Sequence, residues 1–243
     1  MAVKSIQYNQ HTINISYEIV NPKAKIDLII LHGWGSSKNL MKKYFSQYMD
    51  SFRHIYIDLP GFGKSTCNFT LYTKDYAKII ELLMMQLKAS KDIILGHSFG
   101  GKVATLLEPK LLVLLSSAGI LTKKPILTRV KISVFKLLKP FGGKKLYKFF
   151  ATKDVKGMSE SMYETLKRVV NEDFSAIFSK YKGNTLMFWG VKDKATPLEC
   201  GKKIASLLKK SEFFECKGDH FFFLSAGGLI SDNIKRKYKE ISS

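Results

Sequence analysis

Three residues, Ser98, Asp193 and His220, have the types and the chain order that catalysis by a serine nucleophile requires. A serine hydroxyl is a poor nucleophile at neutral pH unless a base takes its proton, and a third group must orient that base. We predict that Ser98 attacks, that His220 acts first as base and then as acid, and that Asp193 orients the imidazole. The order serine, aspartate, histidine is the one expected where the serine lies on a turn between a strand and a helix.

The segment around Ser98 predicts such a turn. Residues 93 to 95 are apolar without alternation, as in a strand buried on both faces, and they lead into Gly96-His97-Ser98-Phe99-Gly100. This segment fits G-x-S-x-G, in which glycines keep the nearby backbone clear of a strained serine at a helix N-terminus. Three fixed residues in five are not rare by chance, so a buried Gly-Ser turn in another α/β protein is the alternative.

The other candidates for the base and the acid have positional explanations. The remaining histidines are His11, His32, His54 and His97. His11 lies in a turn, His54 begins a strand and His97 is beside the nucleophile. His32 precedes a glycine turn, and we expect it to orient loop backbone rather than to transfer a proton. Asp219 is a rival acid, but adjacent side chains such as those of Asp219 and His220 rarely face each other, which favours Asp193.

Attack on a carbonyl creates an oxyanion, and the sequence offers two backbone donors for it. The amide of Phe99 directly follows the nucleophile, and the amide of Trp34 lies in the loop His32-Gly33-Trp34-Gly35. Loss of one such donor typically costs about 3 to 4 kcal/mol of transition-state stabilisation. The Trp34 side chain could also form a wall of the substrate pocket, and the two roles are compatible.

Strands and helices are expected to alternate along the chain and to bring these residues to one edge of a sheet. A hairpin at 3–8 and 12–19 precedes apolar strands, which are expected at 26–31, 54–58, 93–95, 111–116, 185–189 and 212–216. Helices are expected at 38–52, 73–89, 197–209 and 227–240, with Thr73 capping the second of them. This pattern predicts an α/β fold with a doubly wound, mostly parallel sheet, whose loops at the carboxyl ends of the strands build the site.

One long segment interrupts this alternation. More than 60 residues separate the strand ending near Ser117 from the strand beginning near Thr185, and they contain no convincing strand. Apolar residues recur there at helical spacing: Ile126, Val130, Val134, Leu137 and Phe141. A structureless loop of that length is improbable in a compact domain. We therefore predict a core formed by residues 1–119 and 183–243, with 120–182 as an inserted helical cap.

Composition is typical of a globular enzyme. The 243 residues suit one domain, no apolar run approaches the roughly 20 residues of a membrane span, and the N-terminus lacks the apolar core of a signal peptide. Cys67, Cys200 and Cys216 show neither C-x-x-C nor zinc-like spacing and are expected to be free thiols, as in a reducing compartment. We expect a cytoplasmic enzyme with no metal or organic cofactor and no stable membrane insertion.

The formal charge of +20 is spread along the chain and comes mostly from lysine. Only four of the 40 basic residues are arginine, whereas phosphate and base recognition tends to recruit arginine, so we predict no nucleic-acid partner. Between 121 and 156, however, eleven basic residues accompany a single acidic one, Asp154. Three interpretations of this segment stay open: a solvated outer face, a docking surface for an acidic carrier protein or other anionic partner, and an amphipathic lid that touches a membrane.

Together and in order, these motifs resemble those of the α/β-hydrolase superfamily, over nearly the whole chain outside 120–182. The matching segments are His32-Gly33-Trp34-Gly35, Asp58-Leu59-Pro60-Gly61-Phe62-Gly63-Lys64-Ser65, residues 96–101, and the loops at Asp193 and His220. The first two resemble both the pimeloyl-carrier-protein methyl ester esterases of biotin synthesis and the meta-cleavage-product hydrolases, which split carbon–carbon bonds. The first loop lacks the His-Gly-x-Gly-Pro-Gly form usual in the second family. Tryptophan often follows the catalytic histidine there, and Phe221 takes its place, so the resemblance implies that Phe221 contacts substrate together with Trp34.

The sequence is therefore interpreted as that of a carboxylesterase that forms an acyl-enzyme on Ser98 from a small-molecule ester, which an acidic carrier protein could present. Two alternatives remain. One is a carbon–carbon bond hydrolase of the 2-hydroxy-6-oxo-dienoate type, and the other is a non-catalytic protein that uses the basic cap as an interaction module. The complete set of Ser98, Asp193 and His220 argues against the last.

Overall fold

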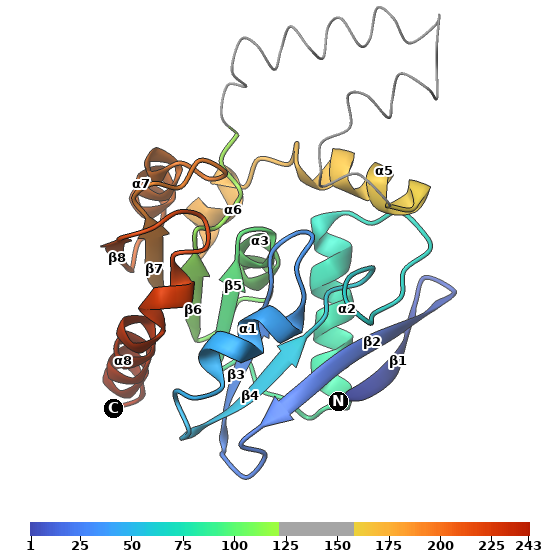
Figure 1. Cartoon of the computed structure of the whole chain (residues 1–243), viewed down its shortest axis with the longest axis horizontal. Helices are drawn as coiled ribbons and strands as arrows, with labels where there is room; N and C mark the ends of the chain where they lie inside the picture. The colour runs from blue at the N-terminus through green and yellow to red at the C-terminus, as the bar shows by residue number, and fades with distance from the viewer. Residues whose placement is uncertain (122–157) are drawn as a thin grey trace, which may run out of the picture.

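The protein is built on one twisted sheet, seen in a computed structural model that describes residues 1–121 and 158–243 (Figure 1). Within these residues the sheet has eight strands in the order β1-β2-β4-β3-β5-β6-β7-β8. The strands are β1 Ala2–Tyr8, β2 His11–Val20, β3 Ile26–Leu31, β4 Phe52–Ile57, β5 Ile93–His97, β6 Leu111–Leu115, β7 Asn184–Gly190 and β8 Ser211–Cys216. Strands β1 and β2 pair antiparallel, β2 pairs antiparallel with β4, and all further pairs are parallel. The predicted mostly parallel sheet and its N-terminal hairpin are confirmed.

Helices cover both faces of this sheet. One face carries α1 Lys38–Phe45 and α8 Phe223–Ser242, whereas the other carries α2 Thr73–Gln86, α3 Phe99–Leu106 and α7 Leu198–Leu207. Two further helices, α5 Glu160–Val169 and α6 Ser175–Lys180, follow residues 122–157, and α5 lies beyond the carboxyl ends of the central strands in Figure 1. A sheet covered in this way is doubly wound, as predicted.

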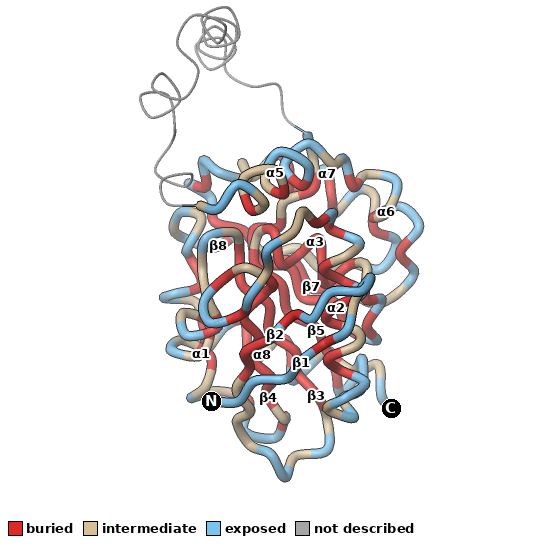
Figure 2. The backbone as a smooth tube through the Cα atoms, turned by 90° about the vertical axis from the view of Figure 1, so that its right-hand side faces the viewer, coloured by how far each residue is buried: buried red, intermediate tan, exposed pale blue. Residues whose placement is uncertain are grey.

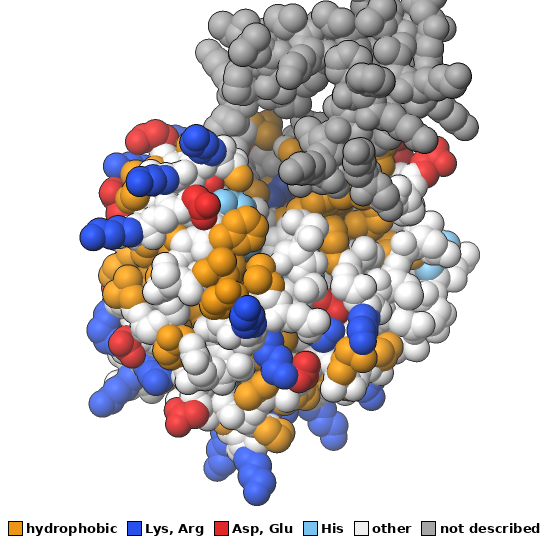
Figure 3. All heavy atoms as spheres, viewed as in Figure 1, with side chains coloured by type: hydrophobic (Ala, Val, Ile, Leu, Met, Phe, Trp, Pro, Cys, Tyr) orange, Lys and Arg blue, Asp and Glu red, His pale blue; other side chains and the backbone are white. Residues whose placement is uncertain are grey.

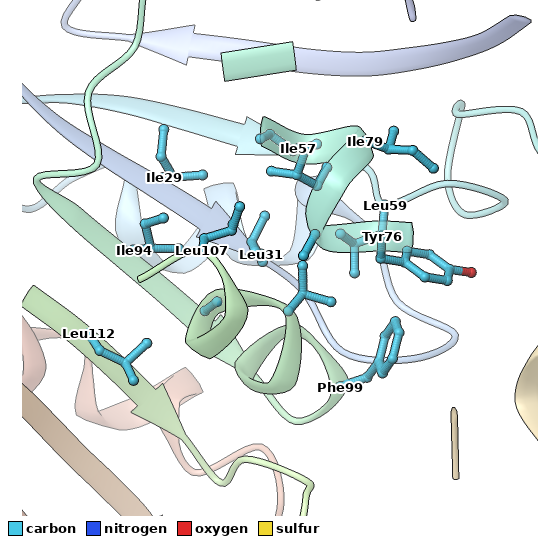
Figure 4. Close-up of a cluster of buried hydrophobic side chains, with 14 of the residues drawn as sticks. Ile29, Leu31, Ile57, Leu59, Tyr76, Ile79, Ile94, Phe99, Leu107 and Leu112 are labelled. Carbon is cyan, nitrogen blue, oxygen red and sulfur yellow. The ribbon is translucent and has the colours of Figure 1, made fainter. Parts of the chain in front are cut away.

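The central strands are buried on both faces, which explains their continuous apolar runs. Side chains alternate across a strand, so Ile29 and Leu31 of β3 enter one apolar cluster while Leu28 and Ile30 enter the cluster on the opposite face. Figure 4 shows part of the first cluster, and Figure 2 shows the buried chain concentrated in the middle of the fold. This packing fixes where each strand ends at the edge of the sheet. It therefore also fixes the positions of the loops that follow the strands.

Several predicted boundaries were wrong. Helix α1 ends at Phe45 rather than near 52: the Tyr48 amide donates to the carbonyl oxygen of Phe45 (3.1 Å) in a turn, Met49 has a left-handed φ of 59°, and β4 begins at Phe52. Thr73 does not cap α2: Tyr72 holds that position, and Thr73 is the first helical residue. Helix α8 begins four residues earlier than predicted and also runs further, to Ser242.

The predicted cap is described only in part. Helices α5 and α6 fall within 120–182, whereas the apolar repeat beginning at Ile126 and most of the basic segment lie outside the described residues. Helix α6 packs on the core, since Phe178 is fully buried and the Tyr181 hydroxyl donates to the carbonyl oxygen of Pro109 (2.7 Å). The division into core and cap at 120 and 182 stays a prediction.

Lysine and arginine side chains are scattered over the face of the molecule shown in Figure 3. Their distribution on that face agrees with the spread of basic residues along the chain. No helix in the described ranges is both long and apolar enough to cross a membrane.

Candidate active site

Ser98 occupies a strained turn between β5 and α3. Its φ of 51° and ψ of −115° lie in a region that side-chain-bearing residues rarely adopt, at a typical cost of about 1 to 3 kcal/mol. The Ser98 amide donates to the carbonyl oxygen of Leu115 (3.0 Å), which holds the turn against β6. A methyl group on Gly96 would lie only 2.3 Å from the carbonyl oxygen of Gly100, so this close turn requires glycine. The predicted strand-turn-helix geometry is confirmed.

Asp193 and His220 are brought together from two different loops. His220 Nδ1 lies 2.8 Å from Asp193 Oδ2, and the His220 side chain is 16% exposed while that of Asp193 is fully buried. The other carboxylate oxygen, Oδ1, accepts from the amides of Ala195 (2.8 Å) and Thr196 (2.9 Å). Burial alone would raise the pKa of Asp193, but the hydrogen bonds from His220 and the Thr196 amide outweigh it and lower that pKa to about 2. The acid is therefore ionised at neutral pH.

The Thr196 hydroxyl is a further partner of this carboxylate that the sequence analysis missed. Its oxygen lies 2.9 Å from Asp193 Oδ2 and 3.0 Å from the carbonyl oxygen of Ser116. It also lies 3.3 Å from His220 Nδ1. The local turn at Asp193 is made with the amides of Ala195 and Thr196, which almost any residue types would supply, so the sequence carried no signal for the hydroxyl of Thr196.

The rival candidate for the acid, Asp219, has another hydrogen-bond partner. The Asp219 carboxylate accepts from the amide of Phe221 (2.9 Å), two residues along the chain. No hydrogen bond between Ser98 Oγ and the His220 ring occurs among the described residues. Such bonds are often long in the absence of substrate and tighten when it binds.

Trp34 and Phe99, whose amides are the predicted oxyanion donors, both lie beside Ser98. Phe99 is the first residue of α3, so its amide has no acceptor within the helix. The loop of Trp34 abuts the nucleophile, since a methyl group on Gly33 would lie 3.1 Å from Ser98 Cβ. The Trp34 and Phe99 rings meet edge to face at 5.4 Å.

Residues 28–230 match the model of the alpha/beta hydrolase family. The chain belongs to this family. It is 26% identical to the uncharacterized hydrolase YugF of Bacillus subtilis (strain 168), over 91% of this chain and 93% of that protein. It is also 26% identical to the pimeloyl-[acyl-carrier protein] methyl ester esterase of Wigglesworthia glossinidia brevipalpis, over 89% of this chain and 95% of that one. An esterase from Exiguobacterium antarcticum shares the fold, with a TM-score of 0.76 at 22% identity over 97% of this chain and 98% of that chain.

In this α/β hydrolase, His32 shapes the loop that carries Trp34. His32 Nδ1 donates to the carbonyl oxygen of Gly33 (2.7 Å), and Nε2 accepts from the amide of Leu59 (3.0 Å). Burial lowers the pKa of His32 to about 4, so the ring is neutral and its tautomer is set by these two partners. The prediction that His32 orients loop backbone is confirmed.

A buried ion pair joins the first residue of α1, directly after the Trp34 loop, to the loop after β4, and the sequence analysis did not find it. Lys38 Nζ donates to Asp58 Oδ2 (2.6 Å) and to the Ser16 hydroxyl (2.9 Å), and both charged side chains are 1% exposed. The Lys38 amide donates to Asp58 Oδ1 (2.8 Å). In this hydrolase, these bonds tie the end of the Trp34 loop to the loop after β4.

Phe221 lies at the rim of the site. It is 43% exposed, and its ring lies 5.5 Å from that of His220.

Cys67, Cys200 and Cys216 are free thiols, as predicted. Over the described ranges of this hydrolase, no group of three or more His, Cys, Asp or Glu side chains is arranged to hold a metal ion.

Proposed function

We propose that the protein is a serine hydrolase that cleaves carboxylic esters through an acyl-enzyme. Its family membership and its likeness to named esterases support hydrolysis, and the loops around Ser98 support a serine nucleophile. Trp34 and Phe99 would supply backbone donors to the oxyanion, and Trp34 and Phe221 would contact the substrate.

In the proposed reaction, Ser98 Oγ attacks the ester carbonyl while His220 Nε2 takes the hydroxyl proton. The tetrahedral intermediate collapses when His220 returns this proton to the leaving alcohol, which leaves an acyl group on Ser98. A water molecule then attacks the acyl-enzyme with His220 again as base, and the free acid departs. Asp193 orients the imidazole and stabilises its cationic form throughout.

The hydrogen bond between Asp193 and His220 is the observation that carries this proposal. The buried carboxylate is ionised and can only accept, so His220 Nδ1 carries the proton that it donates. The neutral ring then presents Nε2 as an acceptor. This is the tautomer that a general base for a serine hydroxyl needs.

Labelling with a fluorophosphonate probe tests the nucleophile. Wild-type protein should be labelled, Ser98→Ala should not, and the control Ser225→Ala, which removes an exposed serine close in sequence to His220, should be labelled like wild type. Absence of wild-type labelling, or undiminished labelling of Ser98→Ala, would contradict the proposal and favour the non-catalytic interaction module.

The bond that is cleaved can be tested separately. Rates on p-nitrophenyl esters of increasing acyl length should exceed the rate on a 2-hydroxy-6-oxo-dienoate, whose hydrolysis breaks a carbon–carbon bond. Faster turnover of the dienoate than of any ester would make the carbon–carbon hydrolase the better assignment.

We also propose that the ester is presented on an acidic carrier protein, as the name of the Wigglesworthia relative suggests. The basic segment between 121 and 156, almost all of it outside the described residues, would attract such a partner.

The value of kcat/KM on an acyl-carrier substrate should then fall with salt and in Lys144→Glu/Lys145→Glu. The control Lys209→Glu/Lys210→Glu makes the same charge change on an exposed lysine pair just before β8 and should have little effect. Equal losses in both variants, or a salt-insensitive rate, would exclude carrier docking by this segment.

A further inference from the structure

His97, the residue before the nucleophile, binds the backbone of the proposed base. It is the last residue of β5 and is 1% exposed. Its Nε2 lies 3.0 Å from the carbonyl oxygen of His220. A carbonyl oxygen can only accept a hydrogen bond, so Nε2 of His97 must carry the proton and donate. The side chain next to Ser98 therefore holds the main chain of His220.

The opposite edge of the His97 ring faces the loop of Trp34. A methyl group on Gly33 would lie only 2.9 Å from His97 Nδ1, and Nδ1 has no hydrogen-bond partner among the described residues. Glycine at 33 therefore leaves just enough room for the ring. The His97 imidazole fills the space between the loop with one proposed oxyanion donor and the backbone of the base.

Neighbouring rings hold the imidazole in this position. The ring centroid of His97 lies 4.7 Å from that of His220, 5.4 Å from that of Phe221 and 4.8 Å from that of Phe223. These contacts come from the loop after β8 and the start of α8. His97 is thus packed on the segment that carries the base over several consecutive residues.

We propose that His97 is a positioning residue. Its ring holds the Trp34 loop and the backbone of His220 apart, and thereby sets the distance between the Ser98 hydroxyl and the His220 ring. This inference rests on the proposed function, because it assigns His97 a role in that reaction. One peptide bond joins His97 to Ser98, so the hydrogen bond to His220 closes a short link between nucleophile and base. A misplacement of about 1 Å between reacting groups can cost roughly 100-fold in rate.

His97 is suited to this role because it does not compete for protons. Burial, and secondarily the nearby His220, lower its pKa to about 3. The ring therefore stays neutral when His220 becomes cationic during the reaction, and its Nε2–H remains a donor. His97 takes no proton from Ser98 in this scheme.

Two substitutions separate positioning from simple filling of space. His97→Phe keeps a ring of similar size but removes the donor, whereas His97→Gln keeps an N–H at about the position of Nε2. His54→Phe serves as a matched control, because His54 is also buried and hydrogen-bonded through Nε2 to a backbone carbonyl (Met49, 2.9 Å), at the opposite end of the strands.

The first readout is kcat and KM on p-nitrophenyl butyrate, with melting temperatures to confirm folding. We expect His97→Phe to lower kcat by about 10- to 100-fold with KM changed less than about twofold. His97→Gln should recover most of that loss, and folded His54→Phe should keep the wild-type kcat. A wild-type kcat in His97→Phe, or equal losses in His97→Phe and His97→Gln at equal folding, would overturn the inference.

The second readout does not depend on turnover. The His220 Nδ1 proton shared with Asp193 should give a downfield proton NMR signal, which Asp193→Asn assigns by its loss. Displacement of the base should shift or broaden this signal in His97→Phe but not in His97→Gln. An unchanged signal in His97→Phe would overturn the inference even if no ester is cleaved. Failure of the proposed function would instead appear as wild-type protein that does not react with a fluorophosphonate.

Discussion

Lys102 Nζ lies 2.7 Å from the carbonyl oxygen of Val169, so a lysine of α3, the helix directly after Ser98, binds the last residue of α5. The ammonium also donates to the carbonyl oxygen of Glu172 (3.2 Å) and to its carboxylate (3.3 Å), and it lies 4.3 Å from the centre of the Phe174 ring. Lys102 is only 2% exposed, and burial lowers its pKa despite the opposing effect of Glu172. Its contacts fasten α5 and the segment after it to the helix that follows Ser98.

This fastening matters because α5 touches a loop of the site. A methyl group on Gly61 would lie 2.3 Å from Met162 Sδ, so Met162 of α5 packs directly on the loop after β4. The same loop carries Phe62, whose ring lies 4.8 Å from that of Trp34. Lys102 therefore helps to set where α5 lies over the proposed substrate side of the site.

Replacing Lys102 by methionine should destabilise the protein and weaken substrate binding. The change leaves the two carbonyl oxygens at Val169 and Glu172 without their buried donor, and we expect a loss of about 2 to 3 kcal/mol in the free energy of unfolding. KM should rise more than kcat falls, because α5 packs on the loop of Phe62, whose ring contacts the proposed substrate contact Trp34. Urea unfolding and ester kinetics measure the two effects.

The matched control for this prediction is Lys167→Met on the same helix. Lys167 pairs with Glu164, but its side chain is 48% exposed, so its removal should change the free energy of unfolding by less than about 0.5 kcal/mol. Equal stabilities of Lys102→Met and Lys167→Met would show that Lys102 does not anchor α5.

The sheet and the loops that carry Ser98, Asp193 and His220 could be predicted from sequence, because buried parallel strands are apolar runs and polar residues stand out at their ends. The wrong end of α1 had a different origin: helical apolar spacing continues to Tyr48, but the helix gives way to a turn after Phe45, and Met49 then takes a left-handed φ. Local spacing cannot show such a turn when the residue is neither glycine nor asparagine.

Contacts between distant residues were beyond the sequence. Lys102 and Glu172 are 70 positions apart, with Glu172 inside the predicted insertion 120–182, and a single lysine among many gives no sign that it is buried. His97 was judged only as a bystander of the nucleophile, because its partner is a backbone carbonyl and leaves no trace in residue type. Both required the fold to be known.

Removing the acid should reduce turnover without unfolding the protein. Asp193→Asn can no longer hold His220 in the tautomer that accepts from Ser98, and kcat on p-nitrophenyl butyrate should fall by about 10³- to 10⁴-fold. The rival Asp219→Asn should lose less than about tenfold, because Asp219 binds the Phe221 amide instead of the His220 ring. A larger loss in Asp219→Asn than in Asp193→Asn would reverse the assignment of the acid.

Thr196 should contribute to the same step more modestly. Thr196→Val removes the hydroxyl that lies 2.9 Å from Asp193 Oδ2, and we expect kcat to fall about tenfold, the effect of one lost hydrogen bond to a charged group. Thr196→Ser keeps the hydroxyl and should retain most of the activity. If the valine and serine variants are equally active, the hydroxyl plays no part in orienting the acid.

Acid should destabilise the fold through its buried histidines. Burial lowers the pKa of His32 to about 4 and of His97 to about 3, against about 6.5 for histidine in an unfolded chain. Between these values the unfolded state binds protons that the folded state does not, so stability is complete above pH 6.5 and is lost as the pH falls towards 4. From pH 7.5 to 5.5 the two residues together should remove about 3 kcal/mol from the free energy of unfolding.

Variants can separate this effect from the general charge of the protein. His97→Gln should reduce the loss between pH 7.5 and 5.5 by about 1.4 kcal/mol, because one proton-binding group is gone from the unfolded state. His11→Gln removes an exposed histidine and should leave the pH dependence as it is in wild type. Urea unfolding at pH 7.5 and 5.5 measures this loss. The same loss in the free energy of unfolding for wild type and His97→Gln would contradict the prediction.

The buried pair of Lys38 and Asp58 should be strongly coupled. Lys38→Met leaves a buried carboxylate without its charged partner, which should cost about 3 to 5 kcal/mol, whereas Lys38→Met/Asp58→Asn should recover part of that loss by removing the orphaned charge. The more exposed pair of Lys42 and Glu18 offers the control, and Lys42→Met should cost less than about 1 kcal/mol. A double variant less stable than Lys38→Met would mean that the Asp58 carboxylate stabilises the two loops mainly through the Lys38 and Lys64 amides, with which it also bonds.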